Sequence, residues 1–184
     1  MVLLDGKLIS NQIKSEIAKE VKEEMLDKGI RAPHLAAVLV GEDPSSQTYV
    51  ASKERSCREV GFISSVYRYP DTIRESQLLE VVDFLNNDPE IDGFIVQLPL
   101  PKHLDEQRII EHIRPSKDVD GFHPVNIGRM VLNLPCYISA TPLGIMTLLE
   151  RYNVETEGKH CVVLGRSHIV GTPVSILMSR KNTP

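Results

Sequence analysis

The stretch HLAAVLVG, residues 34–41, decides the fold expected for this chain. Its six consecutive apolar residues, Leu35 to Val40, are typical of a strand that is buried on both faces. Gly41 ends the run with a residue suited to a tight turn. Because strands buried on both faces occur in parallel sheets covered by helices, the stretch predicts a central strand of such a sheet.

Helices and strands alternate on both sides of this strand. We expect an amphipathic helix over 8–28, ended by Gly29, and a helix from the turn residues of 42–47 to about Val60. The later elements expected are a strand over 62–70, a helix over 71–87 with Asp71 or Thr72 as N-cap, a strand over 91–101, a helix over 103–113, a loop over 114–130, a helix over 141–153 capped by Thr141, and a strand, glycine loop and helix from 159 onward. This order predicts an α/β fold with a parallel sheet flanked by helices, and ligand groups at the carboxyl ends of its strands.

Composition narrows the class of protein. A net charge of −4 gives no basic surface for nucleic acid or an anionic membrane, and the longest apolar run is far shorter than the roughly 20 residues that span a bilayer. The first ten residues lack the apolar core of a signal peptide. Three widely spaced cysteines without a Cys-x-x-Cys pair, and histidines without metal spacing, predict a soluble, cytoplasmic protein with no metal site.

CVVLGRSHIVGTP, residues 161–173, has the pattern of a dinucleotide-binding turn, in which a strand leads through Gly165 and Gly171 to a helix opened by Pro173. The Gly-x5-Gly spacing differs from the usual fingerprint, so a ligand-free turn is the alternative. A guanidinium at Arg166 and a hydroxyl at Ser167 suit a phosphate, and a 2′-phosphate would make the dinucleotide NADP. Since the sequence stops before a second strand of this unit, we expect a fragment or further chain.

Tyr49 and Lys53 share one face of the expected helix, although a solvated surface pair is the simpler explanation. Gln97 stands at the end of a buried strand, where its amide must find hydrogen bonds. Asp120 lies in the loop before Gly121, where an aspartate also serves simply to form a turn. If the strands are parallel, the four polar side chains could line one cleft.

Five blocks come in the order of a known family: YVASKERSCREVGF, DGFIVQLPLP, KDVDGFHPVNIGRM, ATPLGIM and VVLGRSHIVGTP. With them the whole chain resembles the bifunctional methylenetetrahydrofolate dehydrogenase/methenyltetrahydrofolate cyclohydrolase family. The resemblance implies a folate-binding catalytic domain over 1–140, a connecting helix over 141–153, and the first strand, loop and helix of a Rossmann-like NADP-binding domain over 154–184. Ala140 stands where many members have cysteine, which we expect to be neutral, and the later Rossmann segments of the family are missing.

The resemblance also implies two reactions on a tetrahydrofolate derivative. A hydride passes from 5,10-methylenetetrahydrofolate to NADP, and water then opens the methenyl ring to give 10-formyltetrahydrofolate. Lys53 is the expected general base, its neutral form favoured by desolvation and by the cationic substrate, and Gln97 would orient it. Tyr49 would line the folate site, and Asp120 would accept hydrogen bonds from the pterin.

The remaining expectations follow from the same resemblance. Substrate contacts are expected at Tyr49, Lys53, Val96, Gln97, Leu98 and Asp120, and NADP contacts at Gly165, Arg166 and Ser167. The implied protein is a cytoplasmic homodimer of one-carbon metabolism, serving purine biosynthesis, with no nucleic-acid or membrane partner.

Two other functions are compatible with parts of the sequence. A short-chain dehydrogenase also uses Tyr-x3-Lys, but its glycine loop precedes the tyrosine, whereas here the loop follows it. A folate-binding remnant without redox activity fits residues 1 to about 150, and NADP binding would distinguish that remnant from a dehydrogenase. A scaffold protein would not explain five blocks in register.

Overall fold

The computed structural model describes residues 3–180 of the chain, which forms two compact units. The sheet unit comprises Gln12–Val119, and the helical unit combines Met1–Asn11 with Asp120–Pro184. The units divide at 119/120, whereas the predicted functional domains divide at 140/141. A compact unit need not coincide with a functional domain, so the domain boundaries remain a prediction.

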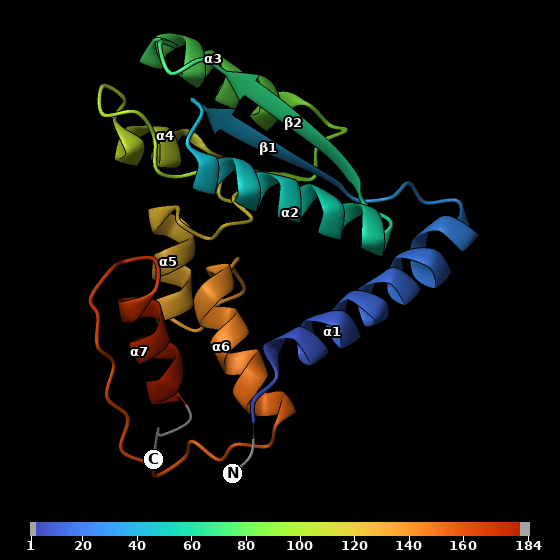
Figure 1. Cartoon of the computed structure of the whole chain (residues 1–184), viewed down its shortest axis with the longest axis vertical. Coiled ribbons are helices and arrows are strands. Elements are labelled where there is room, and N and C mark those ends of the chain that lie inside the picture. Colours follow the sequence, from blue (N-terminus) through green and yellow to red (C-terminus); the bar gives the residue numbers. More distant parts are fainter. Residues whose placement is uncertain (1–2, 181–184) are drawn as a thin grey trace. The chain divides into compact units, whose positions relative to one another are not determined.

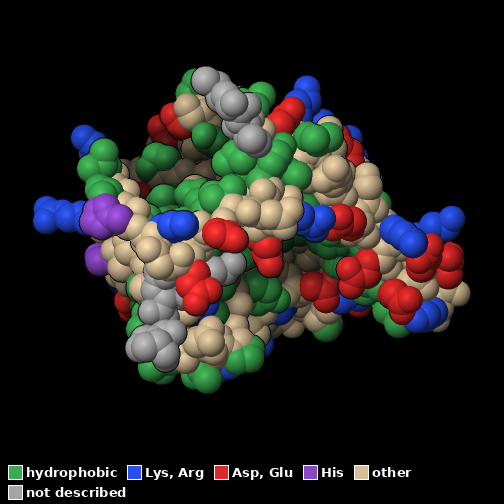
Figure 2. Space-filling view, turned by 90° about the horizontal axis from the view of Figure 1, so that it is seen from below, with side chains coloured by type: hydrophobic (Ala, Val, Ile, Leu, Met, Phe, Trp, Pro, Cys, Tyr) green, Lys and Arg blue, Asp and Glu red, His purple; other side chains and the backbone are tan. Residues whose placement is uncertain are grey.

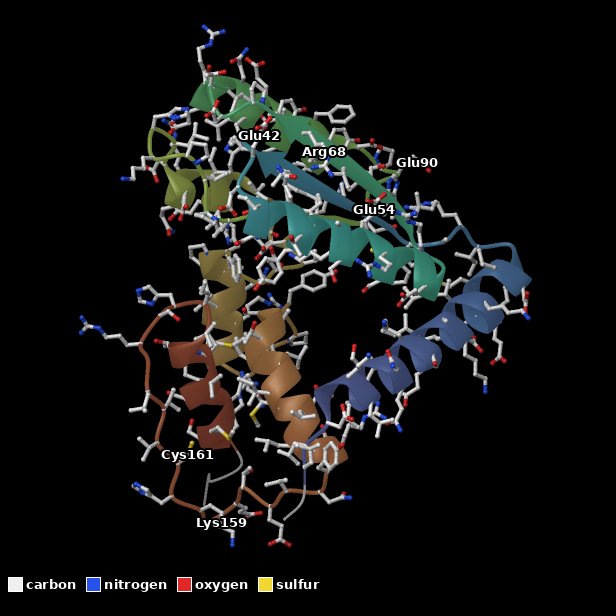
Figure 3. The ribbon with its side chains drawn as sticks, in the orientation of Figure 1. Glu42, Glu54, Arg68, Glu90, Lys159 and Cys161 are labelled. Carbon is white, nitrogen blue, oxygen red and sulfur yellow. The ribbon has the colours of Figure 1, made fainter. Side chains whose placement is uncertain are left out.

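The sheet unit is built on three parallel strands in the order β2-β1-β3. Their bounds are β1 His34–Val40, β2 Ile63–Tyr69 and β3 Gly93–Val96. The apolar run therefore forms the central strand, which confirms the parallel α/β fold expected from it. In Figure 3, Glu42 marks the carboxyl end of β1 and Glu90 lies toward its opposite end.

Helices cover both faces of this sheet, because alternate residues of each strand point to opposite sides. In Figure 1, α2 (Pro44–Val60) lies on one side of β1 and α3 (Glu75–Asn87) on the other. The α2 face buries Ala37, Leu39, Val50 and Ile95. The other face carries the larger core, in which α3 and α4 (Glu106–His112) pack on the strands. Each fully buried Leu, Ile or Phe there contributes about 1.5–3 kcal/mol of transfer free energy.

The chain begins with α1 (Gly6–Glu20), which continues through a π turn, Val21–Met25, and a 3-10 turn, Leu26–Lys28. Gly29 ends this helical stretch with a positive φ of 73°, as its sequence position predicted. Asp5 caps the start of α1, because its carboxylate accepts hydrogen bonds from the amides of Lys7 and Leu8 at 2.9 and 3.0 Å.

The helical unit contains α5 (Pro124–Val131), α6 (Ala140–Arg151) and α7 (Gly171–Ser179), and α7 lies beside α6, as Figure 1 shows. Val174 and Leu177 of α7 are buried. The Ser139 hydroxyl donates a hydrogen bond to the Ile169 carbonyl at 2.8 Å and so ties the start of α6 to the loop before α7. On the face drawn in Figure 2, hydrophobic and charged side chains are interspersed at the surface.

Two helix N-caps differ from the prediction. The N-cap of α3 is Arg74, not Asp71 or Thr72, because the chain first makes a turn in which the Ile73 amide bonds to the Pro70 carbonyl. Ile73 is thereby buried in the core. The N-cap of α6 is Ser139 rather than Thr141, which lies within the helix.

The predicted loop over 114–130 was also wrong in its second half, which forms α5. His123 caps this helix, since its Nδ1 accepts a hydrogen bond from the Val125 amide at 3.0 Å, and Pro124 occupies the first turn. Histidine and proline at a helix start resemble turn residues in sequence, which explains the error.

The strand predicted from residue 159 does not form in the part of the chain that is described. Residues 159–167 have no regular secondary structure and pair with no strand, and Val162 and Leu164 remain 69% and 97% exposed. A strand requires a hydrogen-bonding neighbour, which this segment lacks among the described residues. Figure 3 places Lys159 and Cys161 on this unpaired segment.

Strand β3 is also shorter than the predicted strand over 91–101 and ends before the cis Leu98–Pro99 bond.

Candidate active site

The candidate site lies where α2 begins, just beyond the carboxyl end of β1. Asp43 fixes the first turn, because its carboxylate accepts a hydrogen bond from the Ser46 amide at 2.7 Å and Pro44 follows it. The Ser46 hydrogen bonds hold the pKa of the Asp43 carboxyl below its usual value. This rigid start sets the orientation of Tyr49 and Lys53 on the next two turns.

Lys53 lies on the inward face of α2. The buried residues of this helix are Ser46, Val50, Cys57 and Val60. Lys53 is three residues after Val50 and four before Cys57, so it falls within the same stripe, and it is half-buried. Tyr49, at the flank of the stripe, is 63% exposed. The surface-pair explanation therefore suits the tyrosine but not the lysine.

Cys57 shows what surrounds this stripe. Burial raises the pKa of the Cys57 thiol, while a hydrogen bond with Ser64 and the positive charge of Lys53 act in the opposite direction. The Lys53 ammonium is thus close enough to act electrostatically on a buried group. Cys57 is a free cysteine, and its raised pKa keeps the thiol protonated at neutral pH.

Gln97 follows β3 at the same edge of the sheet. Its main-chain N–H donates a hydrogen bond to the Val38 carbonyl of β1 at 2.9 Å. Strand alternation directs its side chain to the face covered by α2, since Ile95 packs on that face and Leu98 on the other. The Gln97 Nε2 donates to the Leu98 carbonyl at 2.7 Å, whereas its buried Oε1 has no hydrogen-bond partner among the described residues. A buried acceptor of this kind indicates a donor supplied by a ligand or by a rearranged side chain.

Val96 and Leu98, both expected at the substrate, direct their side chains elsewhere. Val96 is buried in the core on the α3 face, and Leu98 packs against the same core. Any contact of these two residues with a substrate at the α2 face would come from their main chain.

Asp120 belongs to the helical unit, whereas Tyr49, Lys53 and Gln97 belong to the sheet unit. It is half-buried and precedes Gly121, whose φ is +68°. A Cβ on Gly121 would stand 2.8 Å from both the Ser139 nitrogen and the Tyr137 carbonyl oxygen, so only glycine fits there. The structure thus places Tyr49 and Lys53 on α2, which covers the sheet face toward which Gln97 is directed, and a cleft shared with Asp120 stays a prediction.

The glycine loop is tightly built although its strand is unpaired. A Cβ on Gly171 would lie 2.4 Å from the Gly165 carbonyl oxygen, so the chain closes on itself at that point. The Ser167 hydroxyl oxygen accepts hydrogen bonds from the amides of Val170 and Gly171 at 3.2 and 3.3 Å. Its hydrogen is left to donate, and the Arg166 side chain is exposed, so the loop offers donors that fit a phosphate.

Sequence reasoning passed over two anchoring residues, Asn86 and Lys117. The Asn86 amide nitrogen donates to the His112 carbonyl at 2.8 Å, and Lys117 donates to two main-chain carbonyls at the end of α3. Neither residue belongs to a recognisable sequence motif, because the atoms that they contact are main-chain carbonyls, which every residue type carries. The sequence shows Lys117 next to Asp118, but only the structure shows that Asp118 is buried.

Neither a metal site nor a membrane span is found over residues 3–180. This part of the chain gathers no group of three His, Cys, Asp or Glu side chains able to hold a metal ion. None of its helices is both long and apolar enough to cross a bilayer.

Comparison with known families matches both parts of the chain. Residues 4–120 match the catalytic domain of tetrahydrofolate dehydrogenase/cyclohydrolase, and residues 139–184 match the NAD(P)-binding domain of the same enzymes.

Among curated relatives, bifunctional protein FolD of Porphyromonas gingivalis is 63% identical over 182 residues, covering 99% of this chain and 61% of that protein. FolD of Cytophaga hutchinsonii is 59% identical, covering 100% of this chain and 63% of that protein. The chain therefore spans about three fifths of the length of these relatives.

Solved structures agree with the sequence matches. The Campylobacter jejuni bifunctional enzyme FolD superposes with a TM-score of 0.95 at 44% identity, covering 99% of this chain and 64% of that one. The Trypanosoma brucei enzyme, solved with NADP cofactor and an inhibitor, gives a TM-score of 0.94 at 32% identity, covering 98% and 62%.

Proposed function

The chain belongs to the tetrahydrofolate dehydrogenase/cyclohydrolase family, and from this we propose that it serves the NADP-dependent oxidation of 5,10-methylenetetrahydrofolate and the hydrolysis of the methenyl product. The observation that carries the proposal is that the buried Oε1 of Gln97 has no partner among the described residues and is directed to the sheet face covered by α2, the helix that carries the half-buried Lys53. These are the groups that a proton-transfer site requires.

Hydrolysis of the methenyl ring needs a base that removes a proton from the attacking water. Lys53 takes this role, its amine nitrogen receiving the proton of the water. Gln97 Oε1 accepts a hydrogen bond from the Lys53 nitrogen and so aims the lone pair of the amine at the water. Tyr49, exposed at the flank, places its ring against the folate.

Oxidation depends chiefly on positioning. When bound, NADP supplies the acceptor for the hydride. Gly165 permits the close approach of a phosphate to the loop, and Arg166 and Ser167 donate hydrogen bonds to it. Asp120 accepts hydrogen bonds from the amino group and ring N–H of the pterin, which holds the methylene carbon in place.

The wider assignment follows the family. We propose a folate-binding catalytic domain over 1–140, a connecting helix over 141–153 and the start of an NADP-binding domain over 154–184. The Trypanosoma brucei structure with NADP supports the choice of cofactor. A cytoplasmic homodimer that supplies 10-formyltetrahydrofolate for purine biosynthesis completes the proposal.

The test is the loss of methenyltetrahydrofolate absorbance in the absence of NADP, because the hydrolytic step needs no cofactor. We expect hydrolysis by the unsubstituted chain and a rate at least about a hundredfold lower with Lys53→Met. Arg58→Met serves as the control, since Arg58 is an exposed cation of the same helix. Full activity in Lys53→Met would exclude the proposed base.

A folate-binding remnant without redox activity is the second candidate, favoured by the exposure of Val162 and Leu164 on the unpaired segment. NADP titration separates the two candidates. Saturable binding that is weakened by Arg166→Ala supports the dehydrogenase, and absence of binding together with retained hydrolysis supports the remnant.

A further inference from the structure

Lys117 makes an unusual pair of hydrogen bonds for a lysine. Its ammonium donates to the main-chain carbonyls of Leu85 at 2.8 Å and Asp88 at 2.6 Å, at the carboxyl end of α3. Desolvation lowers the pKa of Lys117, so the group is drawn partly out of water to make these contacts. The negative end of the α3 dipole favours a cation there.

A second anchor holds the same segment to α3. The Asn86 side chain is buried, donates to the His112 carbonyl at 2.8 Å and accepts from the Arg114 amide at 2.8 Å. The Arg114 guanidinium returns a hydrogen bond to the Asn86 carbonyl at 3.0 Å. The chain from 112 to 117 is therefore tied to the end of α3 at several points.

The anchored segment also lies against β3. The Phe94 amide donates to the Lys117 carbonyl at 2.9 Å, and Asp118 bridges to Phe94 in parallel register. A Cβ on Gly93 would stand 2.3 Å from Val119 Cγ1, so Val119 packs directly on the start of the strand. Val119 is the last residue of the sheet unit, and Asp120, the proposed pterin ligand, is joined to it by one peptide of about 3.8 Å between Cα atoms.

We infer that Lys117 is a positioning residue: it fixes the peptide that carries Asp120 and thereby sets the affinity for the pterin end of the substrate, an inference that rests on the proposed function. A lysine that merely caps α3 would stabilise the fold without acting through Asp120. The two roles differ in how the effect of losing Lys117 depends on Asp120.

A double-mutant cycle separates these roles. Cofactor-free hydrolysis of methenyltetrahydrofolate is measured for the unsubstituted chain, Lys117→Met, Asp120→Ala and the double variant. We expect Lys117→Met to raise KM about tenfold with kcat changed less than about twofold, and to change KM less than about twofold once Asp120 is replaced. Equal factors in both backgrounds, or a loss confined to kcat, would overturn the inference.

Two further variants keep the test decisive. Lys117→Arg retains donors for both carbonyls and should restore KM to near the unsubstituted value, and Lys117→Gln replaces Lys117→Met in the cycle if the latter does not fold. Arg31→Met is the matched control, because Arg31 anchors Asp92 at the amino end of β3 through two hydrogen bonds of 2.6 and 2.8 Å. It should lower Tm and leave KM unchanged.

Absence of hydrolysis by the unsubstituted chain would refute the proposed function itself, and with it this inference, whereas additive effects would refute the inference alone.

Discussion

Two regions of this chain have the same sequence pattern of apolar run, glycine turn and helix, yet only one forms a strand. In the first, β1 lies between β2 and β3 and leads through Gly41 to α2, with Val38 and Leu39 no more than 2% exposed. In the second, residues 160–167 lead through the glycine loop to α7, but Val162 and Leu164 are 69% and 97% exposed. The difference shows that an apolar run becomes a strand only where neighbouring strands supply hydrogen bonds and burial.

The turn of the second region is nevertheless formed. Gly171 closes on Gly165, and Ser167 accepts the hydrogen bonds of two amides. Local hydrogen bonds therefore form the glycine loop although the segment before it pairs with no strand among the described residues. A strand, by contrast, depends on partners that are distant in the sequence. In the first region, both the local cap at Asp43 and the distant pairing of β1 are in place.

Truncation of one leucine in each region should produce the largest contrast. Leu39→Ala removes a buried side chain from the α2 face and should lower the free energy of unfolding by about 2–5 kcal/mol. Leu164→Ala removes an exposed side chain and should change it by less than about 0.5 kcal/mol. Urea denaturation of the two variants measures both values. A loss of several kcal/mol in Leu164→Ala would mean that the second region is packed after all.

Substitution of the turn glycines sharpens the contrast in the opposite direction. Gly171→Ala places a Cβ against the Gly165 carbonyl and should cost about 1–3 kcal/mol. Gly41→Ala, at φ +80° but with its nearest neighbour, Asp71 Cβ, at 3.4 Å, should cost about 1 kcal/mol. Thermal unfolding followed by circular dichroism compares the pair. Tolerance of Gly171→Ala would show that the loop is not closed.

Cysteine reactivity is the mildest probe of the two regions. Cys57 is buried on α2 and its thiol pKa is raised, while Cys161 is exposed on the unpaired segment. Iodoacetamide at pH 8 should therefore alkylate Cys161 at least about tenfold faster than Cys57, as read by peptide mass spectrometry. Similar rates would indicate that α2 opens readily.

The raised pKa of Cys57 also fixes the sign of a pH effect. The folded state holds the thiol proton more tightly than the unfolded state does, so this contribution to stability is present below the unfolded pKa, near pH 9, and is lost as the pH rises above it. Cys57→Ser should flatten this alkaline loss in a pH series of urea midpoints. An unchanged slope would assign the loss to other groups.

Sequence reasoning succeeded where a local pattern and its long-range partners agreed. The run from Leu35 to Val40 predicted the central strand, and Gly29 ends the first helical stretch as predicted. It failed where turn residues were in fact helix caps, as at His123 before α5, and where Arg74 rather than Asp71 or Thr72 begins α3. It also could not reveal that residues 159–167 have no neighbouring strand within residues 3–180.

The candidate site was predictable in its residue types and less so in its arrangement. The spacing of Tyr49 and Lys53 placed both on one helix face, but only the packing of Val50 and Cys57 shows that the lysine points inward. That the Oε1 of Gln97 finds no partner in the described part of the chain depends on three-dimensional surroundings that no motif contains. Lys117 was missed for the same reason, since its partners are backbone carbonyls of α3.

The most direct measurement is a double-mutant cycle on Lys53 and Gln97, read as the initial rate of methenyltetrahydrofolate hydrolysis without NADP. If the two side chains act as one unit at the sheet edge, Lys53→Met and Gln97→Leu should each lower the rate by about a hundredfold or more, and the double variant should be no slower than the slower single variant. Retention of the full rate in Lys53→Met, or a double loss equal to the product of the single losses, would contradict a joint role for these residues.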